Sequence, residues 1–415
     1  MNRLHIVSLE RAFSYLSEET NILKIIGREQ YLFDYDLLHY SDVVEREIKN
    51  SSFLVIGGAG SIGSATIKEI FKRNPKVLHV IDINENDLAE LVRDLRSSYG
   101  YIDGEFKTFV IDVGSDVYHR FITDNFNKYN YVLNFSALKH VRSEKDPYTL
   151  MRMVEVNILN VNKTLEYFMS QKIGKYFCVS TDKATNPVNM MGASKRIMEL
   201  FLYRYSDKIN ISTARFANVA FSNGSLLYSF LQRIQKKQPI VAPDDIKRYF
   251  MAPTESGKLC LLSSLLGKTR EIFFPKLNPE RHMNTPWDVA VRLLEHLGFE
   301  PYVCESEEEA RRLAPILPEK GKWACFVSKT DTTGEKGYEE FYAQEDEVDF
   351  GRFKDIGITK IKGIQDESLL DYFITEITRL RNSKVWSKKD LVYLFEQILP
   401  DFKHEEKGKY LDDKM

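Results

Sequence analysis

The chain of 415 residues carries 58 Lys plus Arg against 60 Asp plus Glu, a formal net charge of −2, with 43% hydrophobic and 28% charged residues. This balance excludes the broad basic field that attracts nucleic acid or an anionic membrane, and the composition excludes wholesale disorder. At roughly 150 residues per domain, the length predicts two or three structural units.

The four cysteines, Cys178, Cys260, Cys304 and Cys325, show no CxxC spacing. We therefore expect no disulfide framework and no metal site, and a reducing cytoplasm fits best. No apolar run approaches the roughly 18 residues that span a bilayer, and charges interrupt the apolar residues of the N-terminus. The expectation is a protein without signal peptide, membrane anchor, membrane partner or nucleic-acid partner.

Residues 1–50 have the pattern of amphipathic helices, which predicts packing or oligomer contacts. From Ser52 the pattern changes to short β-rich runs separated by helix-length amphipathic segments, as in a parallel sheet covered on both faces. Residues 51–221 are therefore expected to form a Rossmann-type, doubly wound α/β domain. Its expected strands are residues 52–57, 77–82, 106–112, 131–137, 175–180 and 211–217.

Two further regions follow. Residues 222–363 lose the alternation and hold most of the prolines, which predicts a smaller, mixed and mainly substrate-binding cap. Residues 364–415 are helical in pattern and highly charged at their end, which predicts a helical tail exposed to solvent rather than a binding element.

A glycine pattern lies between the first expected strand and the next helix. Gly57, Gly60 and Gly63 form GxxGxxG, and Asp82 ends the next strand 19 residues after Gly63, as a dinucleotide site requires. Glycines let backbone N–H groups approach a pyrophosphate at the helix N-terminus, although a turn that needs only flexibility has the same residues. Asp82 would bind ribose hydroxyls and repel a 2′-phosphate, so we expect NAD rather than NADP.

The fifth expected strand runs into a hydroxyl, a carboxylate and an amine, namely Thr181, Asp182 and Lys183. A doubly wound sheet binds its ligands at the carboxyl ends of its strands, so chemistry is expected here. The structural alternative is a charged strand end that points into water.

Six segments between residues 57 and 253 occur in the order that is typical of extended short-chain dehydrogenase/reductases, and the chain resembles that family. In particular, the chain resembles the polysaccharide-biosynthesis branch that dehydrates nucleotide-activated N-acetylglucosamine at carbons 4 and 6, over about residues 50–350. Without a membrane-spanning run, it is similar to soluble members of sialic-acid-like pathways such as legionaminic acid. The segments are GGAGSIG (57–63), Asp82, NFSALKHV (134–141), STDKATNPVNMMGASK (180–195), RFANVAFSNGS (215–225) and KRYFMAP (247–253).

This resemblance implies a cytoplasmic, homo-oligomeric lyase that uses NAD and acts on a UDP- or GDP-linked sugar. The implied catalytic residues are Thr181, Asp182, Lys183 and Lys195. The implied cofactor contacts are Gly57, Gly60, Ser61, Ile62, Gly63, Asp82, Asp112, Val113, Ala137 and Lys195. The implied substrate contacts are Lys139, Met191, Asn218, Ser225 and Arg248, of which the Arg248 guanidinium suits a diphosphate.

The chain departs from the family pattern at two places. Short-chain dehydrogenases usually carry Tyr four residues before the active-site lysine, and Met191 stands there before Lys195. A thioether cannot take a proton, so removal of the 4-hydroxyl proton passes to Thr181 and Asp182; a subset of the dehydratases also carries Met here. In the family's ArgProGlyGluLys motif, Thr332 and Thr333 replace Arg and Pro, which leaves one nucleotide contact unassigned.

The resemblance also implies a mechanism. Hydride leaves sugar carbon 4 for NAD and returns to carbon 6, and the intermediate ketone acidifies the proton on carbon 5. Lys183, if neutral, removes that proton, while Asp182, if protonated, assists loss of the 6-hydroxyl as water. These roles require a lowered pKa at Lys183 and a raised pKa at Asp182.

Two alternatives stay open at this point. A 4-epimerase uses the same first hydride step but gives the pair Asp182 and Lys183 no necessary role. A non-catalytic nucleotide-binding scaffold would explain the missing Tyr, but it would not require Thr181 and Lys195 to be kept beside that pair.

Overall fold

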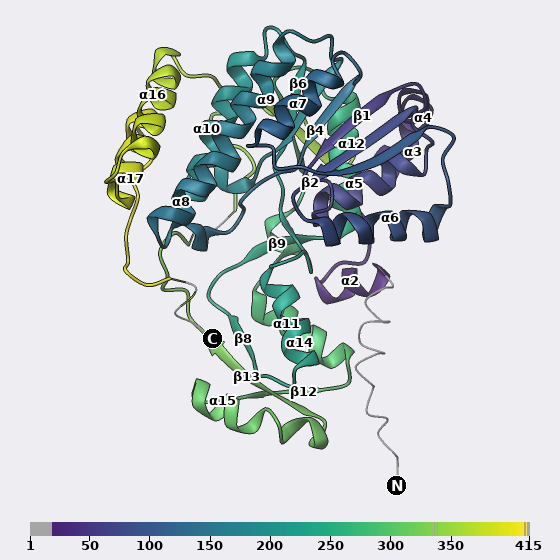
Figure 1. Ribbon diagram of the computed structural model, residues 1–415. Coiled ribbons are helices and arrows are strands. Elements are labelled where there is room, and N and C mark those ends of the chain that lie inside the picture. The colour runs from purple at the N-terminus through teal and green to yellow at the C-terminus, as the bar shows by residue number, and fades with distance from the viewer. Residues whose placement is uncertain (1–18, 336, 338, 411, 413–415) are drawn as a thin grey trace.

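The computed structural model describes residues 19–335, 337, 339–410 and 412, so the expected helices of residues 1–18 and the last three residues of the tail lie outside the described residues. The main feature is an eight-stranded sheet in the order β14-β10-β6-β5-β4-β1-β2-β3 (Figure 1). All of its neighbouring pairs are parallel except β10 with β14. The strands are β1 (Ser52–Ile56), β2 (Val77–Asp82), β3 (Glu105–Val110), β4 (Tyr131–Asn134), β5 (Lys175–Val179), β6 (Ile211–Ala214), β10 (Glu271–Pro275) and β14 (Ile356–Lys360).

All six expected strands are present, and the Rossmann-type parallel sheet is confirmed. Alternate residues of β1 enter two different cores: Leu54 and Ile56 face one, and Phe53 and Val55 face the other. Because helices cover both faces, β1 is buried along its whole length, which explains its uninterrupted apolar sequence.

The first core lies under α7 (Asp116–Asp124), α8 (Pro147–Val154), α9 (Asn160–Met169) and α10 (Met190–Tyr205). A π-helical segment, η2 (Glu155–Leu159), joins α8 to α9. The second core lies under α3 (Asp34–His39), α4 (Ser41–Lys49), α5 (Ser61–Phe71), α6 (Glu85–Tyr99) and α12 (Pro253–Leu266). Short 3-10 helices are η1 (Val141–Glu144), η3 (Asp182–Ala184) and η4 (Leu317–Lys320).

A smaller unit lies below the main sheet in Figure 1. Its core is built by α2, α11, α14, β8 and β13, and two three-stranded sheets, β12-β13-β8 and β11-β9-β7, belong to this part of the chain. The chain then re-enters the main sheet through β10 and β14, so residues 222–363 contribute to both units. The elements are α2 (Glu19–Ile25), β7 (Asn218–Val219), α11 (Leu226–Gln235), β8 (Ile240–Pro243), β9 (Arg248–Met251), α13 (Pro279–His282), β11 (Met283–Asn284), α14 (Pro286–His296), β12 (Glu300–Val303), α15 (Glu307–Leu313) and β13 (Lys322–Ser328).

The described part of the N-terminal region is packed, as expected. Phe33, Val44 and Ile48 enter the second core, and α2 enters the core of the smaller unit. A buried bidentate ion pair links this region to α12: the Arg28 guanidinium donates to Glu255 at 2.6 and 2.7 Å. Breaking such a pair leaves an uncompensated buried charge, so it fixes where the N-terminal region sits.

The C-terminal region corrects the sequence-based expectation of a tail exposed to solvent. Helices α16 (Ser368–Asn382) and α17 (Lys388–Ile398) bury Phe373 and Phe395 in the first core, beside α8 and α10. The charged residues of these helices obscured an apolar stripe on their inner face. Beyond α17 the chain turns back toward the loop of residues 331–335, where Lys409 O accepts from Thr333 N at 2.8 Å. Among the described residues, no helix has both the length and the apolar character needed to cross a membrane.

If α17 is part of the core, Phe395→Ala should lower the free energy of unfolding by about 3–5 kcal/mol, because it removes a fully buried ring. The matched control is Tyr393→Ala on the same helix, whose side chain is 60% exposed and whose loss should cost less than about 0.5 kcal/mol. Urea unfolding measures both. If both substitutions lowered the free energy of unfolding by equally small amounts, the tail would be exposed to solvent and the packing of α17 would be contradicted.

Candidate active site

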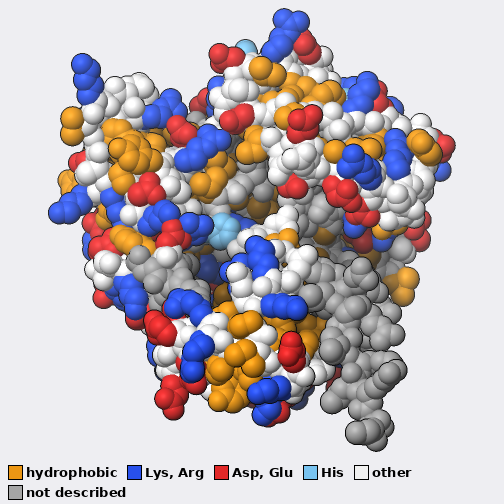
Figure 2. Space-filling view, turned by 60° about the horizontal axis from the view of Figure 1, so that its bottom comes forward, with side chains coloured by type: hydrophobic (Ala, Val, Ile, Leu, Met, Phe, Trp, Pro, Cys, Tyr) orange, Lys and Arg blue, Asp and Glu red, His pale blue; other side chains and the backbone are white. Residues whose placement is uncertain are grey.

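The carboxyl ends of β1, β4, β5 and β6 meet at one edge of the main sheet, as the parallel topology requires. Backbone hydrogen bonds hold the loops that follow these strands side by side. Phe135 N donates to Ile56 O at 2.8 Å, and Ser180 N donates to Ala214 O at 2.8 Å. The glycine turn, residues 135–140, η3 and residues 215–219 therefore form one continuous rim. Figure 2 shows a hollow between the two halves of the molecule, with a histidine and several Lys or Arg side chains at its edge.

The glycine turn fits a dinucleotide. Gly57 has φ +67°, and a Cβ on it would lie 2.6 Å from Ser136 N; a Cβ on Gly63 would lie 2.6 Å from Gly57 O. At Gly60 the nearest atom would be 3.6 Å away, so there is room where α5 begins. Since no side chain caps this helix, its first N–H groups suit a pyrophosphate. Of the other expected contacts in this turn, Ile62 is half-buried and the Ser61 hydroxyl accepts from Asn223 N at 3.0 Å.

Asp82 stands beside this turn at the end of β2. Its two carboxylate oxygens accept from Ala59 N and Asn84 N, each at 3.0 Å. Asp112 follows β3 and accepts from Gly114 N at 2.8 Å, and it also contacts Arg152 at 3.3 Å. Among the remaining expected contacts, Val113 is buried and Ala137 is half-buried at the end of β4. The expected cofactor residues thus lie along one edge of the sheet.

Thr181, Asp182 and Lys183 form a connected group at the end of β5. Thr181 Oγ1 donates to Asp182 Oδ1 at 2.8 Å, and Lys183 Nζ donates to both oxygens of Asp182 at 3.1 and 3.2 Å. The side chain of Asp182 is 2% exposed and that of Lys183 is 19% exposed, so the carboxylate at the centre of this hydroxyl–carboxylate–ammonium chain is buried. It provides groups that can pass a proton from one to the next.

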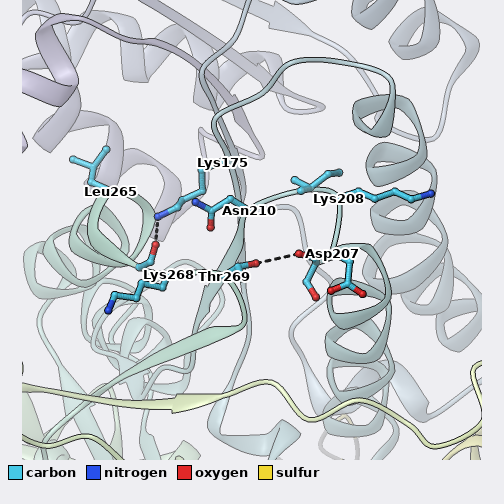
Figure 3. Close-up of a pocket in the computed structure, with 10 residues that line it drawn as sticks. Lys175, Asp207, Lys208, Asn210, Leu265, Lys268 and Thr269 are labelled. Atoms are coloured by element: carbon cyan, nitrogen blue, oxygen red, sulfur yellow. Dashed lines mark hydrogen bonds between the residues drawn. The ribbon is translucent and has the colours of Figure 1, made fainter.

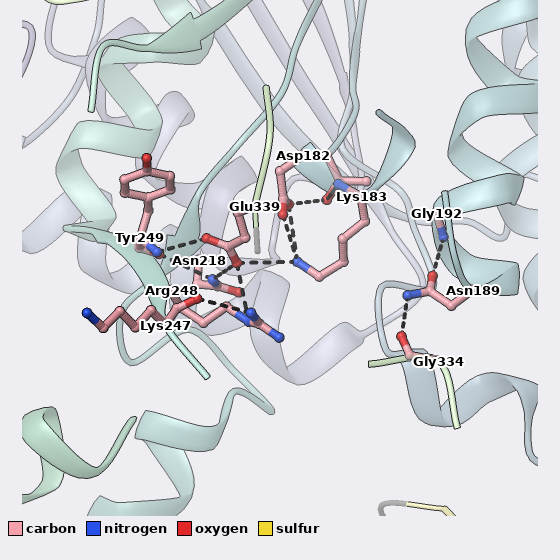
Figure 4. Close-up of polar contacts among 11 residues, drawn as sticks. Asp182, Lys183, Asn189, Gly192, Asn218, Lys247, Arg248, Tyr249, Gly334 and Glu339 are labelled. Atoms are coloured by element: carbon pink, nitrogen blue, oxygen red, sulfur yellow. Dashed lines mark hydrogen bonds and ion pairs between the residues drawn. The ribbon is translucent and has the colours of Figure 1, made fainter. Parts of the chain in front are cut away.

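Glu339 is the residue that the sequence analysis missed. Its carboxylate, 1% exposed, accepts from Asn218 Nδ2 at 2.5 Å and from Tyr249 N at 2.8 Å. Lys183 Nζ lies 3.8 Å and Arg248 Nε lies 3.6 Å from Glu339 Oε1. Figure 4 shows the Lys183 amine between the carboxylates of Asp182 and Glu339. The signal that could have found it is its place three residues after the altered ArgProGlyGluLys motif.

The charges of this group shift one another. Burial alone would lower the pKa of Lys183, but Asp182 and Glu339 raise it above the ordinary lysine value. Burial, reinforced by Asp182, raises the pKa of Glu339 to about 7, although Lys183 and Arg248 oppose the shift. The role assigned to Lys183 requires a lowered pKa, whereas in the free protein two carboxylates raise the pKa and favour the ammonium form.

Lys195 and Met191 lie on the first two turns of α10. Lys195 is 3% exposed and donates from Nζ to Val179 O at 3.1 Å, and burial lowers its pKa. Met191 is 4% exposed and belongs to the first core, so its thioether packs as an apolar side chain. A Cβ on Gly192 would lie 2.2 Å from Lys183 O, which shows how tightly α10 begins against η3.

The structure divides the expected substrate residues. Asn218 and Arg248 meet at Glu339, as described, whereas the Ser225 hydroxyl caps α11 by accepting from Tyr228 N at 3.2 Å. Lys139 is an exposed residue at the rim, and its Nζ donates to Ser222 Oγ at 3.5 Å. Asn218 and Arg248 therefore belong to the charged group, and Ser225 has a structural partner.

A buried ion pair under the site places the segment that carries Glu339. Arg215 donates to both oxygens of Glu199, at 3.0 and 2.7 Å, and its remaining nitrogen donates to Phe341 O at 2.8 Å. Glu199 also accepts from Ser180 Oγ at 2.7 Å. One network thus links β5, β6, α10 and residues 339–341.

A separate pocket lies at the opposite end of the sheet (Figure 3). Its lining comes from Lys175 at the start of β5, from residues 206–210 before β6, from Leu265 in the last turn of α12, and from residues 267–269 after that helix. Because these are the amino ends of parallel strands, the pocket is remote from the rim that holds the charged group. The Lys175 ammonium there donates to Gly267 O, and burial lowers its pKa to about 8.

Sequence comparison places this geometry among known proteins. The profile of the family described as "Polysaccharide biosynthesis protein" matches residues 53–360. An uncharacterised membrane protein of Methanocaldococcus jannaschii is 31% identical over 324 residues, 76% of this chain and 87% of that protein. A capsular polysaccharide biosynthesis protein of Staphylococcus aureus is 30% identical over 64% of this chain but only 44% of its own length. A UDP-glucose 4-epimerase of Rickettsia prowazekii is 26% identical over 55% of this chain and 66% of its own.

Solved structures show the same fold. The protein Pen from Bacillus thuringiensis superimposes with a TM-score of 0.62 at 21% identity, over 85% of this chain and 98% of that one. The dTDP-glucose 4,6-dehydratase DesIV from Streptomyces venezuelae, solved with NAD, superimposes with a TM-score of 0.52 at 17% identity, over 70% and 87%.

Gly57 and Gly63, where an added Cβ would meet backbone atoms, should not tolerate a side chain. Gly57→Ala should cost about 1–3 kcal/mol of stability, because Ala is strained at positive φ and its Cβ would meet Ser136 N. Gly60→Ser, where space is open and Ser is a good helix cap, should change stability by less than about 0.5 kcal/mol. Thermal unfolding of both variants measures this difference. A Gly57→Ala variant as stable as the wild type would contradict the close packing of the turn.

Proposed function

Because the chain belongs to the polysaccharide biosynthesis protein family, we propose that it is a lyase that uses NAD to dehydrate a UDP- or GDP-linked N-acetylglucosamine at carbons 4 and 6. The coarser statement, an enzyme that modifies nucleotide sugars, rests on the family match and on relatives named as polysaccharide biosynthesis proteins and epimerases. A cytoplasmic homo-oligomer and the legionaminic-type specificity are parts of the same proposal.

The observation that carries the proposal is the hydrogen-bonded group Thr181, Asp182 and Lys183 at the end of β5. Elimination of water across two sugar carbons needs one group that takes a proton from carbon and another that gives a proton to the leaving hydroxyl. A carboxylate and an amine in contact provide both. A 4-epimerase needs neither, which is why this group favours dehydration.

NAD would be held by the glycine turn and Asp82, whose geometry fits it: the turn is closed to any Cβ at Gly57 and Gly63, and uncapped N–H groups begin α5. When bound, it would accept a hydride from the sugar and return it. Asp82, already oriented by Ala59 N and Asn84 N, would receive the ribose hydroxyls.

The proton steps fall to the residues at the end of β5. Thr181 Oγ1 would take the proton of the sugar 4-hydroxyl and pass its own along the 2.8 Å hydrogen bond to Asp182. Asp182, once protonated, would supply the proton with which the 6-hydroxyl leaves as water. Arg248, with its planar guanidinium, would bind the diphosphate.

The cofactor preference follows from Asp82. The protein should bind NAD more tightly than NADP, because the carboxylate repels a 2′-phosphate, and Asp82→Asn should reduce this preference by weakening binding of NAD. Isothermal titration calorimetry with both dinucleotides measures it. Tighter binding of NADP to the wild type would overturn the role of Asp82.

The reaction itself is tested with UDP- and GDP-N-acetylglucosamine. The product should be lighter by the mass of one water molecule, and Asp182→Asn and Lys183→Ala should each lower turnover by about 100-fold or more. The exposed residues Asp401 and Lys172 provide matched controls, since Asp401→Asn and Lys172→Ala should leave turnover unchanged. A product of unchanged mass would identify an epimerase instead, and near-normal turnover by either active-site variant would remove its assigned role.

A further inference from the structure

Under the proposed function, on which this inference rests, Lys183 must take a proton from sugar carbon 5. An amine can do so only after it has lost its own proton. In this structure the Lys183 amine contacts Asp182 at 3.1 Å and Glu339 at 3.8 Å, and both carboxylates favour the ammonium form. The site therefore needs a group that relieves Lys183 of its proton.

Two carboxylates are placed to be that group. The side chains of Asp182 and Glu339 are 2% and 1% exposed, and that of Lys183 is 19% exposed, so both carboxylates face the amine from the buried side. Asp182 Oδ1 already accepts from Thr181 Oγ1 as well as from Lys183, and its proton is assigned to the departing water. Glu339 lies on the other side of the amine and has no such assignment.

The surroundings of Glu339 allow it to be charged or neutral. The groups that face it are Asp182 and Lys183 from η3, Asn218 from β7, and Arg248 with the backbone N–H of Tyr249 from β9. Two donors and a guanidinium stabilise the carboxylate, whereas burial and Asp182 favour the carboxyl form. Burial and Asp182 outweigh the opposing groups and raise its pKa to about 7. An anion that draws Arg248 away would favour protonation of Glu339.

We propose that Glu339 is the positioning residue that accepts the proton of Lys183 and so makes Lys183 a base. An N–H bond of Lys183 breaks and an O–H bond forms on Glu339, which leaves a neutral amine and a neutral carboxyl. The amine then takes the proton of carbon 5, and the electron pair of that C–H bond forms the double bond to carbon 6 as the 6-hydroxyl leaves with the proton from Asp182. Lys183 later returns this proton to carbon 5, and Glu339 then returns its proton to Lys183. The starting protonation states are restored, so the step needs no other reactant.

The pH dependence of turnover tests this role. Glu339 can accept a proton only when it is ionised, so the wild-type rate should rise with pH through about 7 and fall below it. The acid limb is the part of the profile in which the rate rises with pH. Glu339→Gln should lower turnover at pH 7 by about 10- to 100-fold and move the midpoint of the acid limb at least about one pH unit higher, because Lys183 must then lose its proton to water. Glu339→Asp, which keeps a carboxylate, should retain the limb. Glu340→Gln removes the neighbouring charge, and its limb should match that of the wild type.

Two readouts separate this role from a purely structural one. In 13C NMR of the substrate-free protein, one glutamate carboxyl should titrate near pH 7 and be missing from Glu339→Gln. Exchange of solvent deuterium into sugar carbon 5 should slow in the same variant.

A folded Glu339→Gln with the wild-type acid limb, or no glutamate titrating between about pH 6 and 8, would overturn the proposal. If Glu339→Gln does not fold, Glu339→Asp without the limb would overturn it too. A wild type that dehydrates neither sugar would instead refute the proposed function, and the NMR titration would still report on Glu339.

Discussion

The candidate site depends on one interaction: the Lys183 ammonium lies between two buried carboxylates, Asp182 and Glu339. With Arg248 the group joins two basic and two acidic side chains, of which the two acidic ones are almost fully buried. Such a group is stable only while every member keeps its partners, because an unpaired buried charge costs several kcal/mol. It also places a second carboxylate, Glu339, next to the Lys183 ammonium, and the proposed chemistry needs such a proton acceptor there.

The rest of the fold brings these charges together. The parallel sheet places Asp182 and Lys183 at the end of β5, beside the glycine turn that follows β1. Glu339 arrives from a loop far along the chain, and the bond from Arg215 to Phe341 O holds that loop from below. From the side, Asn189 Nδ2 donates to Gly334 O at 2.7 Å, and the Thr333 hydroxyl donates to Glu406 of the C-terminal segment at 2.9 Å. The C-terminal segment, which lies beyond the family match, thus contacts the loop that leads to Glu339.

The sequence was sufficient for features that repeat or are local. Strand-length apolar runs predicted all six strands of residues 52–217. The spacing from Gly63 to Asp82 predicted that Asp82 lies beside the glycine turn, and Asp82 indeed accepts a hydrogen bond from Ala59 N of that turn. It was insufficient for contacts without local periodicity. Glu339 meets Asn218 across 121 positions of sequence, and a Glu pair in a loop has the pattern of an ordinary surface. The packing of α16 and α17 was missed because their charged outer faces dominate their composition. The raised pKa of Lys183 follows first from Asp182, its neighbour in sequence, and then from Glu339, which sequence alone did not place there.

The central claim is that these charges serve an elimination in which the hydrogen of carbon 4 moves to carbon 6 of the same sugar. The most direct measurement uses UDP- and GDP-N-acetylglucosamine carrying deuterium at carbon 4, followed by NMR of the product. A dehydratase with a retained dinucleotide should deliver the deuterium to carbon 6 of a 4-keto-6-deoxy sugar. Deuterium found again at carbon 4 of a product that still carries its 6-hydroxyl would contradict the claim and identify a 4-epimerase.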